Sequence, residues 1–241
     1  MSNGEKKTIL ITGCTSGIGL DAARYLHECG YEILLVSRNK QKLEAVSSEI
    51  GGAKYFICDF EVQEQIKDIF SFCLERKIKL DGMVHSAGFT SNMPIRSYCE
   101  EDMRRLMQLN YFAFIELCKG FYNRKISNDN ASIVAISSLA ALTKRKASAL
   151  YAGSKSAMNT AVSVASKEFV KRSIRVNALM PGYVDTRVNT ILEDLMDDVN
   201  EKQPWGLIPP RDIAYIIEFL LSDKSKYITG ATIPVSAGME Y

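Results

Sequence analysis

The chain has 241 residues, 46% of them hydrophobic and 24% charged, with a formal net charge of +2, which is the balance of a soluble globular protein and gives no basis for nucleic-acid binding. Uncharged stretches such as 8–20 and 131–143 are too short to span a bilayer. Six cysteines form no CxxC pair, and only two histidines accompany them, so we expect a reducing, cytoplasmic setting without disulfides or a metal site.

Short runs rich in Ile, Val and Leu alternate with longer segments of helical character. The predicted strands are Thr8–Thr12, Tyr31–Ser37, Lys54–Cys58, Gly82–Ser86, Ser132–Ser137, Arg175–Met180 and Thr232–Val235. The predicted helices are Gly17–Cys29, Lys40–Ile50, Val62–Arg76, Glu100–Tyr122, Ser148–Arg172 and Asp212–Leu221. Continuous apolar strands are covered on both faces, and regular alternation indicates right-handed crossovers. The sequence therefore predicts one α/β domain over 1–241, a doubly wound Rossmann fold with helices on both faces of one parallel seven-stranded sheet.

The first strand leads through a glycine-rich turn into the first helix, in the order Thr12-Gly13-Cys-Thr-Ser-Gly17-Ile-Gly19. Gly13 permits a sharp turn, Gly17 a close approach of backbone to a pyrophosphate, and Gly19 tight packing of the helix on the strand. Unpaired N–H groups at the helix start favour phosphate binding. A purely structural turn is the alternative.

The end of the second strand bears on which dinucleotide is bound. An acidic residue there binds the ribose 2′-hydroxyl of NAD, whereas an arginine suits the 2′-phosphate of NADP. Here the strand ends in Ser37-Arg38 without a carboxylate, so we expect NADP(H) to be preferred over NAD(H); a solvated Arg38 is the alternative. After the third strand, Asp59 is a candidate acceptor for an adenine amino group, or else an N-cap for the following helix.

A tyrosine and a lysine four residues apart, Tyr151 and Lys155, share one face of a predicted helix. A free phenol titrates near 10, and a nearby ammonium favours the phenolate, so the pair is suited to proton transfer. Ser138 follows a predicted strand at the ligand-binding edge of the sheet. Asn110 interrupts an otherwise apolar helix segment and would need a buried partner.

The connection between Pro181 and Pro210 is longer than the fold requires, and such loops often cover binding sites. Apolar residues recur in it at helical spacing between acidic ones; they are Ile191, Leu192, Leu195, Met196 and Val199. We interpret the stretch at about 183–210 as a substrate lid; a surface helix without a binding role is the alternative.

Together these motifs, with Pro181-Gly182-x-x-x-Thr186, resemble the short-chain dehydrogenase/reductase family in its compact single-domain branch, and in outline its 3-oxoacyl-carrier-protein reductases. The resemblance implies hydride transfer between a nicotinamide cofactor and a carbonyl or secondary alcohol. Tyr151 would be the general acid/base, Lys155 would lower its pKa and bind the nicotinamide ribose, Ser138 would polarise the substrate carbonyl, and Asn110 would anchor a proton-relaying water.

By the same resemblance, the stretch from Pro181 to Thr186 would cover the nicotinamide, and Ala87-Gly88 would lie beside the adenosine ribose. The expected cofactor-binding positions are Gly13, Thr15, Ser16, Gly17, Ile18, Gly19, Ser37, Arg38, Asp59, Phe60, Ala87, Gly88, Tyr151, Lys155, Pro181, Gly182, Val184 and Thr186. The family also implies a homodimer or homotetramer.

The chain departs from the family pattern in two places, near the C-terminus and after the fourth strand. Near the C-terminus, Val235-Ser236-Ala237-Gly238 replaces a more usual Asp-Gly-Gly. After the fourth strand, His85-Ser86 stands where the family has two asparagines that brace the sheet. We expect this difference to affect the local stability of the sheet more than the reaction. A carrier-bound substrate is weakly supported, because Lys171-Arg172 matches one of the two basic places that carrier-protein reductases use and 128–130 does not match the other. The remaining alternative is a non-catalytic NADP-binding scaffold or sensor.

Overall fold

A computed structural model describes residues 6–186, 199 and 201–241. It contains a seven-stranded sheet in the order β3-β2-β1-β4-β5-β6-β7, with every neighbouring pair parallel. The strands are β1 (Thr8–Thr12), β2 (Glu32–Ser37), β3 (Lys54–Ile57), β4 (Leu80–His85), β5 (Ser127–Ile136), β6 (Arg175–Pro181) and β7 (Thr232–Val235). The predicted doubly wound Rossmann sheet is confirmed.

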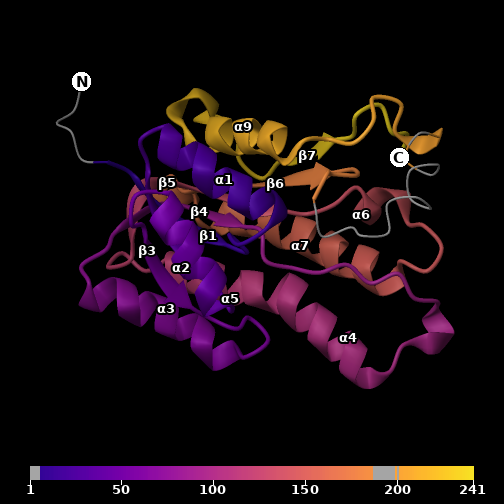
Figure 1. Cartoon of the computed structure of the whole chain (residues 1–241), viewed down its shortest axis with the longest axis horizontal. Coiled ribbons are helices and arrows are strands. Elements are labelled where there is room, and N and C mark those ends of the chain that lie inside the picture. The colour runs from indigo at the N-terminus through magenta and orange to yellow at the C-terminus, as the bar shows by residue number, and fades with distance from the viewer. Residues whose placement is uncertain (1–5, 187–198, 200) are drawn as a thin grey trace.

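The α-helices connect these strands and cover both faces of the sheet. They are α1 (Gly17–Glu28), α2 (Lys40–Glu49), α3 (Gln63–Glu75), α4 (Glu100–Met107), α5 (Ala113–Phe121), α6 (Ala140–Thr143), α7 (Ala149–Glu168) and α9 (Pro210–Leu221). Short 3₁₀ turns lie at Ile95–Ser97, Val170–Arg172 and Asp223–Ser225, and a π-helical turn, η2 (Gln108–Phe112), joins α4 to α5. Figure 1 shows α1 and α9 together above the sheet and α4, α5 and α7 below it.

Alternate strand residues supply the two cores. Ile9 and Ile11 pack with α1, α2 and α9 on one face, whereas Leu10 packs with α3, α5 and α7 on the other. Because both sets are fully buried, the three central residues of β1 are all apolar, the pattern expected for a central parallel strand. Strand order reverses between β1 and β4, and in such sheets ligands bind outside the carboxyl ends of the strands near that point.

Most differences between the predicted and the observed elements are shifts in where a strand or helix begins or ends. Two further differences lie near the ligand-binding edge of the sheet. The helix expected over Glu100–Tyr122 is divided by η2, and the unpredicted α6 follows β5. The amphipathic segment expected at 191–199 lies outside the described residues except for Val199, which is buried.

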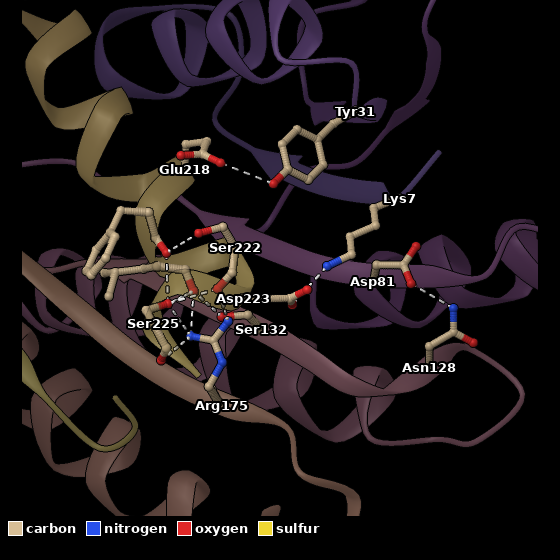
Figure 2. A network of polar contacts seen from close by, with 12 residues as sticks. Lys7, Tyr31, Asp81, Asn128, Ser132, Arg175, Glu218, Ser222, Asp223 and Ser225 are labelled. Atoms are coloured by element: carbon tan, nitrogen blue, oxygen red, sulfur yellow. Dashed lines mark hydrogen bonds and ion pairs between the residues drawn. The ribbon is translucent and has the colours of Figure 1, made fainter. Parts of the chain in front are cut away.

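A buried cation joins β6 to the end of α9, as Figure 2 shows. Arg175 donates hydrogen bonds to the carbonyl oxygens of Leu220 (2.6 Å), Ser222 (3.1 Å) and Ser225 (3.3 Å), and to the Ser225 hydroxyl (2.8 Å). Burial lowers the pKa of Arg175, yet the carbonyl groups at a helix C-terminus favour a cation there.

Replacing this cation should destabilise the fold. Arg175→Met would leave carbonyl groups without their charged donor, so we expect the free energy of unfolding to fall by about 2–4 kcal/mol in urea titrations. Lys7→Met is the matched control, because Lys7 pairs with Asp223 in the same region through exposed side chains (3.2 Å; Figure 2) and should cost less than about 1 kcal/mol. Similar losses in both variants would contradict a special role for Arg175.

Candidate active site

A cavity of about 880 Å³ lies at the carboxyl ends of the strands. It runs from the ends of β2 and β3 past the turn after β1 to the ends of β5 and β6. The expected catalytic and cofactor-binding residues all line it except Gly19 and Asn110. The topology therefore brings together motifs that are far apart in the chain.

The glycine turn is packed too closely for side chains. Gly13 has φ +67°, and a Cβ there would lie 2.7 Å from the backbone nitrogen of Ala87. A Cβ on Gly19 would collide with the Gly13 carbonyl, so this residue lets α1 pack on the turn rather than facing the cavity. At the start of α1, Ser16 makes no side-chain cap, which leaves this end of the helix suited to an anionic ligand.

Thr12 holds the facing turn after β4 in place. Its hydroxyl oxygen accepts hydrogen bonds from the backbone of Ser86 (3.2 Å) and Ala87 (3.1 Å) and lies 3.0 Å from His85 Nδ1. Because two N–H groups already donate to this oxygen, the hydroxyl must donate to Nδ1, and the proton of neutral His85 is on Nε2. Burial and the nearby Lys155 charge lower the pKa of His85 to about 3. A neutral histidine thus takes over the bracing position of the sheet.

Asn110 lies in the π-helical turn η2 and is fully buried. Its side chain bonds the backbone N–H and carbonyl of Phe89, both at 3.0 Å, and its amide donates to Ser154 (3.1 Å). A Cβ on Gly88 would lie 2.9 Å from the Asn110 oxygen and 3.5 Å from Lys155 Nζ. Asn110 therefore fixes the chain after β4 directly beneath the cavity, behind the residues that line it.

Ser138, Tyr151 and Lys155 meet at the end of β5 and the start of α7. The ammonium of Lys155 donates to the carbonyl of Ile136 (2.8 Å) and lies 6.0 Å from the centre of the Tyr151 ring. Burial lowers the pKa of Lys155 to about 8. Burial raises the pKa of Tyr151, and a hydrogen bond with Ser138 opposes that rise. The three side chains form a set that can exchange a proton with a ligand in the cavity.

The opposite end of the cavity carries Arg38 after β2 and two acidic residues after β3. Asp59 accepts from the backbone N–H of Glu61 (3.0 Å), which makes it a turn residue rather than the N-cap of α3. Glu61 forms ion pairs with Arg38 (3.3 Å) and with Arg105 of α4 (2.9 Å). Sequence reasoning missed Glu61 and Arg105, because the first lies 23 residues after Arg38 and no motif marks the contact.

The segment after β6 is fixed by a second residue that the sequence did not single out. Gln203 is fully buried and bonds both the backbone N–H (2.8 Å) and the carbonyl (2.9 Å) of Tyr183. Farther along, a Cβ on Gly17 would lie 2.8 Å from the Thr186 side chain. The stretch from Pro181 to Thr186 therefore reaches from the Ser138 end of the cavity back to the glycine turn.

The chain is similar to known proteins over nearly its whole length. A family model described as Enoyl-(Acyl carrier protein) reductase matches residues 13–240. The 3-oxoacyl-[acyl-carrier-protein] reductase FabG of Rickettsia conorii is 30% identical, with 97% of this chain and 96% of the relative covered. The chain belongs to the short-chain dehydrogenase/reductase family. The carbonyl reductase family member 4 of Xenopus laevis is 29% identical over 97% of this chain and 98% of the relative.

Solved structures of this family have the same fold. The short-chain dehydrogenase/reductase (glucose/ribitol dehydrogenase) of Brucella melitensis gives a TM-score of 0.92 at 28% identity, with 98% of each chain covered. A blue fluorescent protein from a metagenomic library, solved in complex with NADPH, gives 0.91 at 25% identity, also over 98% of each chain. As a short-chain dehydrogenase/reductase, the chain is an oxidoreductase that interconverts carbonyl and alcohol groups with a nicotinamide cofactor. In the described part of the chain, no helix is long and apolar enough to cross a membrane.

Proposed function

We propose that the chain reduces a carbonyl substrate, or oxidises the corresponding alcohol, in this cavity, with Tyr151 as the general acid/base. The observation that carries the proposal is that Ser138, Tyr151 and Lys155 line the same cavity as the glycine turn. The cofactor supplies or accepts the hydride. Ser138 binds the substrate oxygen and Tyr151 donates its proton to that oxygen during reduction, or removes the alcohol proton in the reverse direction.

The residues present fit a dinucleotide along the whole cavity. The uncapped start of α1, with Thr15, Ser16, Gly17 and Ile18 around it, would hold the pyrophosphate. Lys155 would bind the nicotinamide ribose and stabilise negative charge on Tyr151, and the stretch from Pro181 to Thr186 would cover the nicotinamide. Ala87, Gly88, Asp59 and Phe60 would surround the adenosine. Asn110 would act through the backbone of Phe89, and through a water that accepts protons from Lys155.

We also propose that NADP(H) is preferred over NAD(H), because Arg38 lies on the cavity rim where a 2′-phosphate would meet a guanidinium. Arg38→Ala should therefore weaken NADPH binding by roughly 10- to 100-fold and change NADH binding much less, since only NADPH loses a charge-assisted hydrogen bond. Fluorescence titration of both cofactors measures this. Equal losses for the two cofactors would contradict the assignment.

A carrier-bound 3-oxoacyl group is the narrower candidate substrate, favoured by the names of relatives such as FabG. Against it, Arg172 is 3% exposed and binds Asp129 (2.7 Å) and the carbonyl oxygens of Tyr122 and Ser127. Because these bonds occupy the buried Arg172 guanidinium, Lys171 is the one residue of the basic pair at 171–172 that could bind an acidic carrier. Small-molecule carbonyl compounds are therefore our first choice of substrate class.

A screen of NADPH oxidation separates these possibilities. We expect the wild type to oxidise NADPH with simple ketones and aldehydes. We expect this turnover to fall to background when Tyr151 is replaced by Phe. Turnover confined to 3-oxoacyl thioesters would select the carrier-protein activity. Cofactor binding without turnover of any carbonyl compound would contradict an enzyme and favour a scaffold or sensor.

We further propose a single cytoplasmic domain in which the stretch at about 183–210 covers the substrate, assembled as a homodimer or homotetramer. Support for assembly comes from apolar side chains exposed on the outer faces of η2, α5 and α7, namely Phe112, Ile115 and Val164, which are 47%, 37% and 47% exposed. Such residues are typical of faces covered by a second copy of the chain. Sedimentation analysis tests the oligomeric state.

A further inference from the structure

One carboxylate lies between two guanidinium groups that come from different elements lining the cavity. Glu61, in the turn after β3, contacts Arg38 at the end of β2 and Arg105 on α4, at 3.3 Å and 2.9 Å. Its side chain is 26% exposed, against 63% for Arg38 and 46% for Arg105. The two arginines hold the pKa of Glu61 below its usual range. All three residues line the cavity. The two guanidinium groups therefore already bind an anionic group, the carboxylate of Glu61.

The position of the carboxylate is fixed from the α4 side. The Arg105 guanidinium also lies over the Phe89 ring, 5.1 Å from its centre, and the backbone of Phe89 is held by Asn110. Gln108, one turn along the same helical segment, donates to the carbonyl of Phe60 (3.1 Å), next to Glu61. Arg105 is therefore a fixed partner for Glu61, whereas the more exposed Arg38 is the partner that an incoming ligand can reach.

We propose that Glu61 sets the strength of the preference for NADP(H) over NAD(H), because its carboxylate competes with the ribose 2′-phosphate for Arg38. Arg105 weakens this competition, because it forms an ion pair with the same carboxylate. The inference rests on the proposed binding of NADP(H) in this cavity. A 2′-phosphate would have to separate Arg38 from Glu61 and would bear a negative charge close to the carboxylate. NADH has a hydroxyl group there, so its binding requires no such exchange.

Two substitutions should then act in opposite directions on one cofactor. Glu61→Gln keeps the side-chain shape, frees Arg38 and removes the repulsion, so the Kd for NADPH should fall by about 3- to 10-fold, as expected for charge interactions at a partly exposed site. Arg105→Gln leaves Glu61 to pair with Arg38 alone, so the Kd for NADPH should rise by roughly 2- to 5-fold. The Kd for NADH should stay within about twofold in both variants, because neither change touches a group that NADH requires.

The experiment is fluorescence titration of the full chain with NADPH and with NADH, for the wild type, both single variants and the double variant. Glu64→Gln is the control for net charge, because Glu64 lies in the first turn of α3, is exposed and does not line the cavity. We expect this control to leave both Kd values unchanged, and Arg105→Gln to have little effect once Glu61 is Gln. Parallel changes for the two cofactors would show a merely structural role and overturn the inference, as would weaker NADPH binding in Glu61→Gln.

Failure of this inference can be told apart from failure of the proposed function. If Arg38→Ala weakens NADPH selectively but Glu61→Gln changes neither cofactor, the 2′-phosphate still binds Arg38 and only the competition is wrong. If Arg38→Ala also has no selective effect, the proposed NADP(H) preference itself is wrong. Thermal unfolding of each variant without cofactor checks that a change in Kd does not arise from a damaged fold.

Discussion

Tyr151→Phe should lower kcat for carbonyl reduction by about 10²–10⁴-fold, the range expected when a general acid is removed. The change deletes one oxygen and keeps the ring on α7, so the cavity and its glycine turn should be preserved. NADPH should therefore bind with nearly unchanged Kd while turnover is lost. Steady-state kinetics together with fluorescence titration measure both quantities on the same preparation.

A second tyrosine in the same cavity provides the control. Tyr183 lines the cavity, and its hydroxyl contacts Arg145. Tyr183→Phe likewise removes one phenol oxygen from a residue that lines the cavity, so we expect kcat to change by less than about tenfold, because the Tyr183 hydroxyl contacts Arg145 whereas that of Tyr151 bonds with Ser138. Equal losses in the two variants would mean that Tyr151 has no special part in proton transfer, and unchanged turnover in Tyr151→Phe would exclude it from the reaction.

The electrostatics around Tyr151 differ from the sequence-based expectation. Its helical spacing with Lys155 predicts a lowered phenol pKa, whereas in the chain itself burial raises the pKa of Tyr151 and Ser138 is the group that lowers it. The reason is that the Lys155 ammonium is turned to the Ile136 carbonyl and is itself desolvated. With a raised pKa, Tyr151 keeps its proton through neutral pH, which suits the reductive direction; alcohol oxidation, which needs the phenolate, should become faster as pH rises.

The sequence predicted the sheet well, and the side chains of Ser138, Tyr151 and Lys155 do line one cavity, because both depend on local patterns. Few arrangements are compatible with strands whose central residues are all apolar, as in β1, followed by a glycine turn with close backbone approach at Gly13. Parallel topology then brings strand ends to one edge, so Ser138 and Gly13 meet without any further information.

Other features could not be predicted, because they depend on side chains that meet across the fold. In the sequence Arg38 has no acidic residue near it, but in the fold Glu61, which follows the neighbouring strand β3, forms an ion pair with it. The π-helical turn at Asn110 arises where a buried amide must reach the backbone of Phe89, and a regular apolar helix pattern gives no sign of it. Gln203 looks like an ordinary polar residue until its two bonds to Tyr183 are seen.

Lys155→Met should reduce activity by roughly 100-fold, as expected at an intermediate dielectric constant for losing an ammonium whose nitrogen lies 6.0 Å from the centre of the Tyr151 ring. The change should leave the fold at least as stable at neutral pH. Lys155 is 5% exposed, and burial lowers its pKa from 10.5 to about 8. Because the folded-state pKa lies below the unfolded one, the charged form costs stability, and this cost is fully present below pH 8. The cost disappears as pH rises from about 8 to 10.5, since in that interval the unfolded chain still binds the proton of Lys155 whereas the folded chain has lost it.

The size of the effect follows from the shift. About 2.5 pKa units correspond to roughly 3 kcal/mol, against which the wild type gains about 1 kcal/mol from the hydrogen bond to Ile136. Methionine carries no charge, so the wild type should gain roughly 3 kcal/mol relative to Lys155→Met between pH 8 and 10.5. Urea unfolding of both proteins across this interval measures the difference, and titrations shared by the two cancel. A stability difference independent of pH would show that Lys155 is not held as a desolvated ammonium, and the charge assigned to it beside Tyr151 would then have no basis.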